Sequence, residues 1–357
     1  MPTEEADMSL PHLDRSGRPT LRTVAELAGV HVSTVSRALS DSPSANERSG
    51  SQRTIARIRE IAAEVGFERN PHGSGLRTSR SSLLGVLVPR LSDVVLATIY
   101  EGIEDSARAR GYQTFVVNGR DEPAIRRERL QMLLARRVDG IVLGDAHGDA
   151  DELAATLAER GTPFVLTNRH SAAHVSVTCD DLLGGRLAAE HLLDLGHTAL
   201  AVVAGEPYAS TGRDRTAGFL QVCAERGVEV PPERIVHAQF DVDGGRGAAG
   251  ALLASPAPPT GMFVVNDFAA IGAMGAARAA GLTVGTDVAI VGYNDIPLAS
   301  QLPVPLTSVA SPMHEMGVRA AETLIAAIDG RPVESLRLPP TLSVRESSTG
   351  VLEPTTL

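Results

Sequence analysis

The stretch TLRTVAELAGVHVSTVSRALS, residues 20–40, predicts two short amphipathic helices joined by a tight turn. Thr20 can cap the first helix, Val24 begins its apolar face, and Gly29 can end it in the left-handed conformation that glycine adopts easily. The second helix is predicted over residues 32–39. This is the spacing of a helix-turn-helix, whose second helix enters the major groove of DNA. From the spacing alone, a three-helix bundle with incidental polar residues is an equally good interpretation.

The segments on either side of this stretch extend it to a small domain. Residues 1–19 are polar and acidic without periodicity, which predicts a disordered tail. A third helix is predicted over residues 53–65, and residues 69–82 are rich in Pro, Gly, Ser and Arg, which predicts a hinge. The expected parts are a tail (1–19), a helix-turn-helix domain (20–68), a hinge (69–82), a body (83–347) and a C-terminal tail (348–357).

Beyond the hinge, short β-rich segments alternate with helices. Segments such as LLGVLVP (83–89) and ALAVVAG (199–205) are almost continuously apolar, which is typical of parallel strands covered on both faces. Eight such units over about 260 residues fit two doubly wound lobes better than one. We expect an α/β body in which lobe one comprises residues 83–178 and 309–335, and lobe two comprises residues 180–306 and 336–347.

Composition narrows the class of protein further. The 357 residues carry a net charge of −10, yet residues 20–80 contain nine arginines against six acidic residues. From residue 83 onward there are 22 arginines against 33 acidic residues. A basic head on an acidic body is the charge pattern of a regulated DNA-binding protein. The chain contains no lysine, which excludes Walker-A, Schiff-base and Ser-x-x-Lys chemistry.

Cysteine usage and the first residues of the chain indicate the cellular compartment. Cys179 and Cys223 each lie in an apolar run, which predicts reduced thiols and no disulfide framework. The first nineteen residues lack the cationic start and apolar stretch of a secretory signal. No apolar run reaches the ~18 residues of a membrane span. We therefore expect a cytoplasmic protein.

Polar residues follow the predicted strands of the body, at the carboxyl ends where doubly wound sheets bind ligands. Singly, each is readily explained as a loop residue or a helix cap, but together they predict a binding cleft. Many hydrogen-bonding groups with a single aromatic ring suit a small polar, hydroxylated ligand. The residues are Asp93, Arg120, Asp145, Asn168, Arg169, Arg213, Arg215, Phe240, Asp241, Asn266, Asp267, Asn294 and Asp295.

The order of several blocks resembles that of the lac repressor (LacI/GalR) family of bacterial transcription regulators. The resemblance covers about residues 20–347. It implies a periplasmic-binding-protein-like body and a homodimeric repressor of catabolic genes that binds a palindromic operator, responds to a small effector such as a sugar, and needs no cofactor. Besides residues 20–40, it is carried by Leu76-Arg77-Thr78, RRVDGIVL (136–143), RDRTAGF (213–219), VVND (264–267) and VGYNDIPLA (291–299).

The resemblance also implies roles for residues of the head. Val32 and Ser33 are expected to discriminate bases, Arg37 to contact base edges, and Leu76 to wedge into the minor groove at the centre of a palindrome. Contacts to phosphate are expected from Thr20, Leu21, Arg22, His31, Thr34 and Ser36.

The head departs from the family pattern in three places. His31 stands where the family usually has a serine N-cap, and imidazole caps a helix less well. The hinge carries Pro71, Gly73 and Gly75, and each glycine costs about 1 kcal/mol of helix relative to alanine. We therefore expect the hinge to order only on DNA. About four or five additional residues stand around residues 44–51.

For the cleft, the resemblance implies that Arg215 clamps hydroxyl or carboxylate groups of the effector and that Phe240 covers it. Val95 and Leu96 stand where many members carry adjacent aromatic residues, so a stacking face for a pyranose is missing. The expected effector-binding residues are Asp93, Asp145, Arg169, Arg215, Phe240, Asn266 and Asn294.

The family's tetramers use a C-terminal leucine heptad. Residues 350–357, GVLEPTTL, contain a proline and are too few for a coiled coil, so a dimer is expected.

Two other classes of protein stay open. A solute-binding protein with the same body is opposed by the missing export signal and the basic head. An α/β hydrolase is opposed by the absence of a Gly-x-Ser-x-Gly elbow and of a nucleophile–base pair. Gly245-x-Gly247-x-x-Gly250 fits a dinucleotide fingerprint, but Asp241 and Asp243 precede it, so a glycine-rich helix start is the better interpretation. The histidine and cysteine spacings do not match a metal site.

Overall fold

The computed structural model describes residues 12–13, 18–39, 51–67, 80–147 and 152–350. The chain divides into two compact units, Met1–Ser79 and Arg80–Leu357. The predictions made for Leu76 and most of the hinge, for the additional residues near 44–50, and for most of both tails fall outside the described residues.

The first unit contains three helices at the predicted positions. Apolar side chains from all three meet in one core, in which Val24, Val35 and Ile58 are fully buried. The helices are α1 (Leu21–Ala28), α2 (Val32–Ala38) and α4 (Gln52–Glu64).

The ends of the first two helices are set by local hydrogen bonds. The Thr20 hydroxyl accepts from the backbone N–H of Thr23 at 3.3 Å and so caps α1. Gly29 ends α1 with φ +66°, the left-handed conformation expected of it. His31 caps α2, because its Nδ1 accepts from the backbone N–H of Ser33 at 3.2 Å.

Part of the N-terminal segment folds back onto α1. Leu13 and Pro19 form an isolated antiparallel bridge. The carbonyl oxygen of His12 accepts hydrogen bonds from the hydroxyls of Thr20 at 2.9 Å and Thr23 at 2.6 Å. The prediction of a disordered tail over residues 1–19 is therefore wrong for these residues, because their backbone finds hydroxyl partners on the helix.

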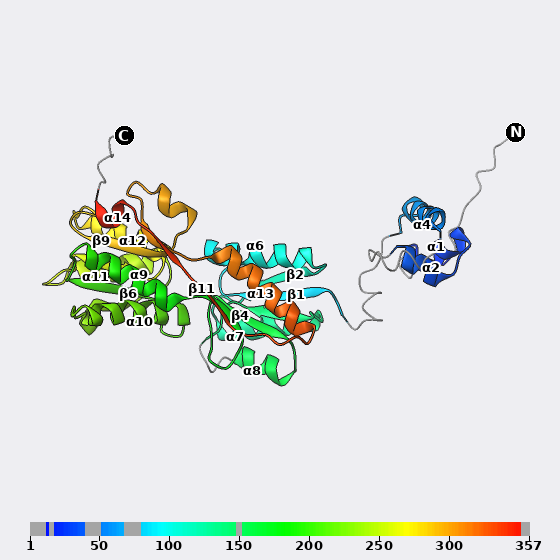
Figure 1. The fold of residues 1–357 in the computed structure, drawn as a ribbon, viewed down its shortest axis with the longest axis horizontal. Coiled ribbons are helices and arrows are strands. Elements are labelled where there is room, and N and C mark those ends of the chain that lie inside the picture. The colour runs from blue at the N-terminus through cyan, green and yellow to red at the C-terminus, as the bar shows by residue number, and fades with distance from the viewer. Residues whose placement is uncertain (1–11, 14–17, 40–50, 68–79, 148–151, 351–357) are drawn as a thin grey trace. The chain divides into compact units, whose positions relative to one another are not determined.

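The second unit consists of two lobes, each built on a six-stranded sheet, which confirms the predicted α/β architecture (Figure 1). Neighbouring strands are parallel except for β12, which is antiparallel to β10. The sheet of lobe one has the order β11 (Leu336–Leu338), β5 (Ser176–Cys179), β4 (Phe164–Thr167), β3 (Gly140–Leu143), β1 (Leu83–Val88), β2 (Gln113–Asn118). The sheet of lobe two has the order β12 (Thr341–Ser343), β10 (Thr307–Ala310), β9 (Ala289–Asn294), β8 (Gly261–Val264), β6 (Leu200–Ala204), β7 (Ile235–His237).

Helices cover both faces of each sheet, as the almost continuously apolar strands require. In lobe one, α6 (Val94–Ala109) packs on α13 (Met313–Ile328) over one face, and α7 (Pro123–Ala135) and α8 (Glu152–Glu159) cover the other. None of the described helices is long and apolar enough to span a membrane. Lobe two pairs α9 (Asp181–Asp194) with α10 (Ser210–Glu225), and α11 (Val242–Leu253) with α12 (Asp267–Ala279); the short elements are η1 (Pro232–Arg234), η2 (Pro297–Gln301) and α14 (Glu346–Thr349).

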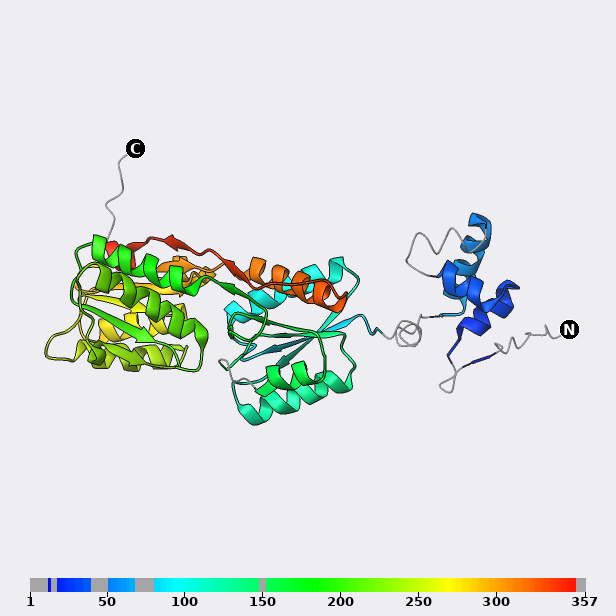
Figure 2. The ribbon, with the colours of Figure 1, turned by 60° about the horizontal axis from the view of Figure 1, so that its bottom comes forward.

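The chain crosses between the lobes after β5, after β10 and after β11 (Figure 2). The predicted lobe limits are wrong at the last two crossings. β11 belongs to lobe one, because it pairs with β5, and all of β10 belongs to lobe two, because it pairs with β9. A three-residue edge strand carries too little pattern to show which sheet it joins.

The glycine motif in lobe two has a packing role at its first position. A Cβ at Gly245 would lie 2.0 Å from the carbonyl oxygen of Ala269, so only glycine lets α11 approach α12 this closely. A Cβ at Gly247 or Gly250 would meet nothing within 4 Å.

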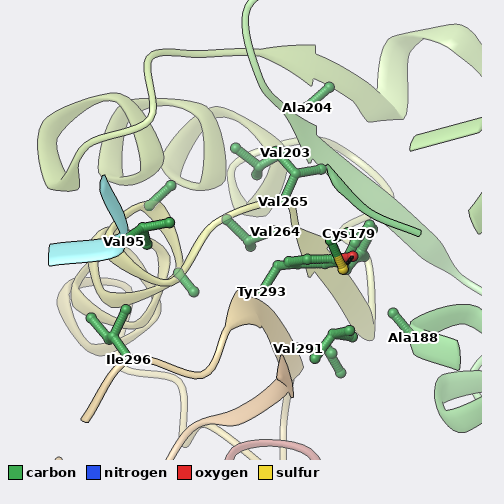
Figure 3. Packing of buried hydrophobic residues seen from close by; sticks show 14 of the residues in the cluster. Val95, Cys179, Ala188, Val203, Ala204, Val264, Val265, Val291, Tyr293 and Ile296 are labelled. Carbon is green, nitrogen blue, oxygen red and sulfur yellow. Dashed lines mark hydrogen bonds between the residues drawn. The ribbon is translucent and has the colours of Figure 1, made fainter. Parts of the chain in front are cut away.

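Tyr293, at the end of β9, is the largest fully buried side chain among the described residues. Figure 3 shows its ring beside Cys179, with Val264, Val265 and Val291 around it. The Tyr293 hydroxyl lies 3.4 Å from the Cys179 sulfur. Both cysteines are free and buried, and burial raises the pKa of each thiol to about 11, which makes them poor nucleophiles.

Candidate functional site

Most of the residues predicted to read DNA lie on the side of α2 that faces away from the core, whereas Val32 packs against the core. Val35 and Ala38 are buried against α1 and α4. The Nε of Arg37 donates to the carbonyl oxygen of Ser33 at 3.0 Å, which holds the start of its guanidinium along the helix surface. The residues of this side, all exposed or half-buried, are Ser33, Thr34, Ser36 and Arg37.

The start of α1 offers fewer free groups than the sequence predicts. The Thr20 hydroxyl is engaged by His12 and Thr23, and Leu21 packs against the core of the first unit. Arg22 is exposed. Arg22 and the backbone N–H groups of the first turn are therefore the groups that can meet a phosphate.

A cleft opens between the two lobes of the second unit. It brings together six of the seven predicted effector-binding residues: Asp93, Arg169, Arg215, Phe240, Asn266 and Asn294. Its other lining residues are Pro89, Arg90, Val95, Leu96, Asp121, Asn168, Glu206 and Thr211. Arg90, Asp121, Glu206 and Thr211 were missed by the sequence analysis, although Arg90, Asp121 and Glu206 follow strands just as the predicted residues do.

Asp145 does not line the cleft, so its assignment is wrong. Its carboxylate is completely buried in lobe one and pairs with Arg126 of α7, at 2.8 Å from Nε and 3.2 Å from Nη2. A Cβ at Gly119 would lie 2.7 Å from this carboxylate, so the surrounding backbone is packed around the pair. Asp145 follows a strand as expected, but its side chain turns toward α7.

Arg215 lies at the bottom of the cleft with two of its five N–H donors in use. Its Nε donates to Asp181 at 2.8 Å and its Nη1 to the carbonyl oxygen of Val265 at 2.8 Å. The guanidinium carbon stands 3.7 Å from the centre of the Tyr293 ring. Among the described residues, Nη2 has no hydrogen-bond partner. Arg215 is therefore both a structural ion-pair partner and a residue of the cleft wall.

A second arginine of the cleft is also held by a carboxylate. Asp121 accepts two parallel hydrogen bonds from Arg169, at 2.8 and 2.9 Å, and its Oδ1 lies 3.0 Å from His147 Nε2. Burial alone raises the pKa of Asp121, but the hydrogen bonds from His147 and Arg169 outweigh it and hold that pKa below its usual range. Tyr208 of lobe two packs over Arg169, 5.4 Å from ring centre to guanidinium carbon.

Two buried polar atoms of the cleft residues have no partner within the described part of the chain. They are Asn294 Oδ1 and Arg169 Nε. Asn294 is held at φ +105°, an uncommon backbone conformation for a residue other than glycine. Unpaired buried polar groups are costly, and their meeting in one cleft indicates that a ligand supplies the missing partners.

The remaining polar groups complete a mixed set of donors and acceptors. Asp93 caps α6, with one carboxylate oxygen accepting from the N–H of Val95 at 3.0 Å, and burial raises its pKa. Asn266 caps α12 through its Oδ1, which accepts from the N–H of Ala269 at 2.8 Å. The second Asp93 oxygen and the Asn266 amino group are thus available to a ligand.

The apolar part of the cleft comes from both lobes. Phe240 follows β7, and a Cβ at Gly205 would lie 2.1 Å from the tip of its ring, so this glycine makes room for the ring. Val95 and Leu96, at the start of α6, are the aliphatic contribution of lobe one. One aromatic and several aliphatic side chains can contact the C–H groups of a ligand.

Contacts near the cleft also join the two lobes. His170 of lobe one lies 2.6 Å from the Asp214 carboxylate of α10, and its backbone N–H donates to the Ser210 hydroxyl at 2.9 Å. Arg90 lies 4.0 Å from Asp241 across the opening. These polar contacts are of a kind that can break and re-form when the lobes move.

Both units resemble known proteins. Residues 20–70 match the family of bacterial regulatory proteins, lacI family, and residues 189–348 match the periplasmic binding protein-like domain. The HTH-type transcriptional regulator DegA of Bacillus subtilis (strain 168) is 30% identical over 337 residues, which are 93% of this chain and 98% of DegA.

Solved structures agree with this. The lac repressor dimer bound to operator and the anti-inducer ONPF has a TM-score of 0.83 and 28% identity, covering 92% of this chain and 99% of that one. The complex of the transcriptional regulator CelR with cellobiose has a TM-score of 0.71 and 29% identity, covering 92% of this chain and 100% of that one.

Proposed function

Because this chain belongs to the lacI family of bacterial regulatory proteins, which are DNA-binding transcription regulators and not enzymes, we propose that it is a repressor of catabolic genes. It binds a palindromic operator as a homodimer, and a small polar effector such as a sugar controls its affinity for that operator. Family membership removes the hydrolase and the solute-binding protein as alternatives.

The observation that carries the proposal is the cleft. Unpaired acceptor and donor atoms at Asn294 and Arg169 face the same space as Arg215 and Phe240. Such a set suits a small hydroxylated molecule, and the relatives are consistent with it: CelR is solved with cellobiose, and the lac repressor with operator and ONPF.

Control of DNA binding follows from the two-lobed design. An effector that contacts both lobes favours the arrangement in which they are close, where His170 meets Asp214 and Arg90 approaches Asp241. Closure in each protomer changes the spacing of the two DNA-binding heads, and thereby the affinity for a site of fixed half-site spacing.

The experiment that tests the proposal is capture of DNA fragments by the purified full chain, with and without added metabolites, followed by sequencing. We expect a single palindromic sequence to be enriched and its recovery to change with one class of metabolite. Enrichment of no common sequence would contradict the proposal.

Replacement of Arg37 by alanine is expected to weaken operator binding by about 1–3 kcal/mol and to relax specificity at one position of each half-site. The reason is its place on the exposed side of α2. Binding titrations on operator variants measure both effects. Arg59→Ala, which removes the same charge from an exposed position of α4, is the control and should leave base specificity unchanged. Equal effects of the two changes on base specificity would show that Arg37 does not contact base edges.

The full chain is expected to be a dimer at micromolar concentration. The lac repressor structure that resembles it is a dimer on its operator, and a palindromic site presents two equivalent half-sites. Light scattering coupled to size-exclusion chromatography measures the mass directly. A stable tetramer or a monomer that does not dimerise on operator DNA would contradict this prediction.

A further inference from the structure

We propose that Asp121 and Asp181 are specificity determinants of the cleft: they occupy the two buried arginines and so restrict the site to uncharged polyhydroxylated ligands, excluding sugar acids and sugar phosphates. The inference rests on the proposed role of the cleft as the effector site. It goes further in stating the charge of the effector and the residues that select it.

The guanidinium of Arg169 is already paired with a carboxylate. Arginine binds carboxylates and phosphates best through two parallel N–H bonds from its planar fork. In Arg169 both terminal amino groups are already given to the two oxygens of Asp121, at 2.8 and 2.9 Å. Nε is buried without a partner, and each terminal amino group keeps one further N–H. Because the positive charge of Arg169 is already paired with a carboxylate, a second anion gains less from this arginine than from an unpaired one, whereas a hydroxyl oxygen can accept from Nε.

Arg215 is limited in the same way. Asp181, itself buried, accepts from Nε at 2.8 Å, and Val265 takes Nη1. The ring of Tyr293 covers a face of the guanidinium at 3.7 Å. The Nη2 amino group remains for a ligand, and the positive charge of the guanidinium is compensated by Asp181.

The acceptors of the cleft require a ligand that donates hydrogen bonds. Asn294 Oδ1 is buried and unpaired, and one oxygen of Asp93 is free of the helix cap. Among the described residues Asp93 has no ion-pair partner. Hydroxyl groups both donate and accept, so they satisfy these acceptors and the remaining donors of the arginines together. A carboxylate or phosphate cannot donate to them and is repelled by Asp93.

The third arginine of the lining, Arg90, does not give the cleft an excess of positive charge. Arg90 is half exposed, where water and salt screen its charge, and it lies 4.0 Å from Asp241. The lining thus contains three arginines and three acidic residues, Asp93, Asp121 and Glu206. A fourth acidic residue, Asp181, pairs with Arg215. An anion would enter a site that already contains at least as many negative as positive groups.

The test compares matched neutral and anionic sugars on the full chain by isothermal titration calorimetry. The panel consists of the common aldopentoses, aldohexoses and alditols, together with glucuronate, galacturonate and ribose 5-phosphate as charged partners of glucose, galactose and ribose. At least one neutral compound should bind, and neutral members of the pairs should bind about tenfold or more tightly than their charged partners. Binding of no neutral compound, or tighter binding of an anionic partner, would overturn the inference.

The Asp121→Ala variant tests the residue itself, because it frees the fork of Arg169. The affinity for the anionic sugars should rise by about tenfold or more relative to the wild type, while that for their neutral partners rises less. Asp105→Ala is the matched control: Asp105 also meets an arginine and a histidine, Arg108 and His314, but lies outside the cleft. It should change neither affinity.

Folding is checked by thermal unfolding, and Asp121→Asn, which keeps the volume but loses the charge, should shift selectivity in the same direction. An unchanged ratio of anionic to neutral affinity in both folded variants overturns the inference. Operator binding is measured on the same samples. If the wild-type chain binds no specific operator, the proposed function is contradicted. If it binds a specific operator but prefers anionic sugars to neutral ones, only the inference is contradicted.

Discussion

Replacement of Arg215 by alanine is expected to lower the free energy of unfolding by about 3–5 kcal/mol. The change removes the partner of Asp181, whose carboxylate is buried and accepts from Arg215 Nε at 2.8 Å. It also leaves the Val265 carbonyl without its donor and takes a cation from the Tyr293 ring. A buried charge without a partner is far more costly than the pair itself is stabilising.

Urea titration of the full chain measures this loss, and the double variant Arg215→Met with Asp181→Asn should recover much of it because no charge is left buried.

The contribution of Arg215 to effector affinity is measured separately in Arg215→Lys, which keeps the positive charge but loses the planar group. A hydrogen bond from a charged donor is worth about 1.5–3 kcal/mol, so effector affinity should fall by about 10–100-fold. Wild-type affinity in a folded lysine variant would mean that Arg215 only supports the wall of the cleft.

Replacement of Asp145 by alanine is expected to lower the free energy of unfolding by a similar amount, about 3–5 kcal/mol, while leaving effector affinity nearly unchanged. Arg126 is buried with it and would lose both of its hydrogen bonds to Asp145. Because Asp145 is not part of the cleft lining, no ligand contact is removed.

The double variant Arg126→Met with Asp145→Leu is the control, since apolar residues of similar volume often replace a buried ion pair at little cost. Urea titration and effector calorimetry on the same preparations separate the two effects. A stable Asp145→Ala protein that no longer binds effector would return Asp145 to the effector site and contradict its placement here.

The sequence was sufficient for the helices and the architecture. The three helices of the first unit are predicted because apolar residues recur at helical spacing and Thr20 and Gly29 mark the ends of α1. The two parallel sheets are predicted because their strands are apolar on both faces. These signals are local, so no long-range contact is needed to interpret them. The membership of β11 depends on a partner strand more than 150 residues away in the chain and could not be predicted.

Most of the cleft was also within reach of the sequence. Parallel strands must bring their carboxyl ends to one edge, so residues such as Asp93, Asn266 and Asn294 are placed near one another by topology alone. Topology places the backbone, however, and not the side chain. Asp145 and Asp121 both follow strands of lobe one, yet one turns toward Arg126 beneath the surface and the other toward the cleft.

What the sequence by itself determined is the set of elements, their order and the edge at which polar residues gather, because helical and strand periodicity and parallel topology are properties of short segments. Only the tertiary structure decided which charges meet. Arg215 pairs with Asp181 and not with its neighbour Asp214 or with Asp241, and Arg169 pairs with Asp121, because packing of α9 against α10 and of the loops after β2 and β4 sets these distances. Ion pairs between residues 34 and 48 positions apart leave no periodic trace in the sequence.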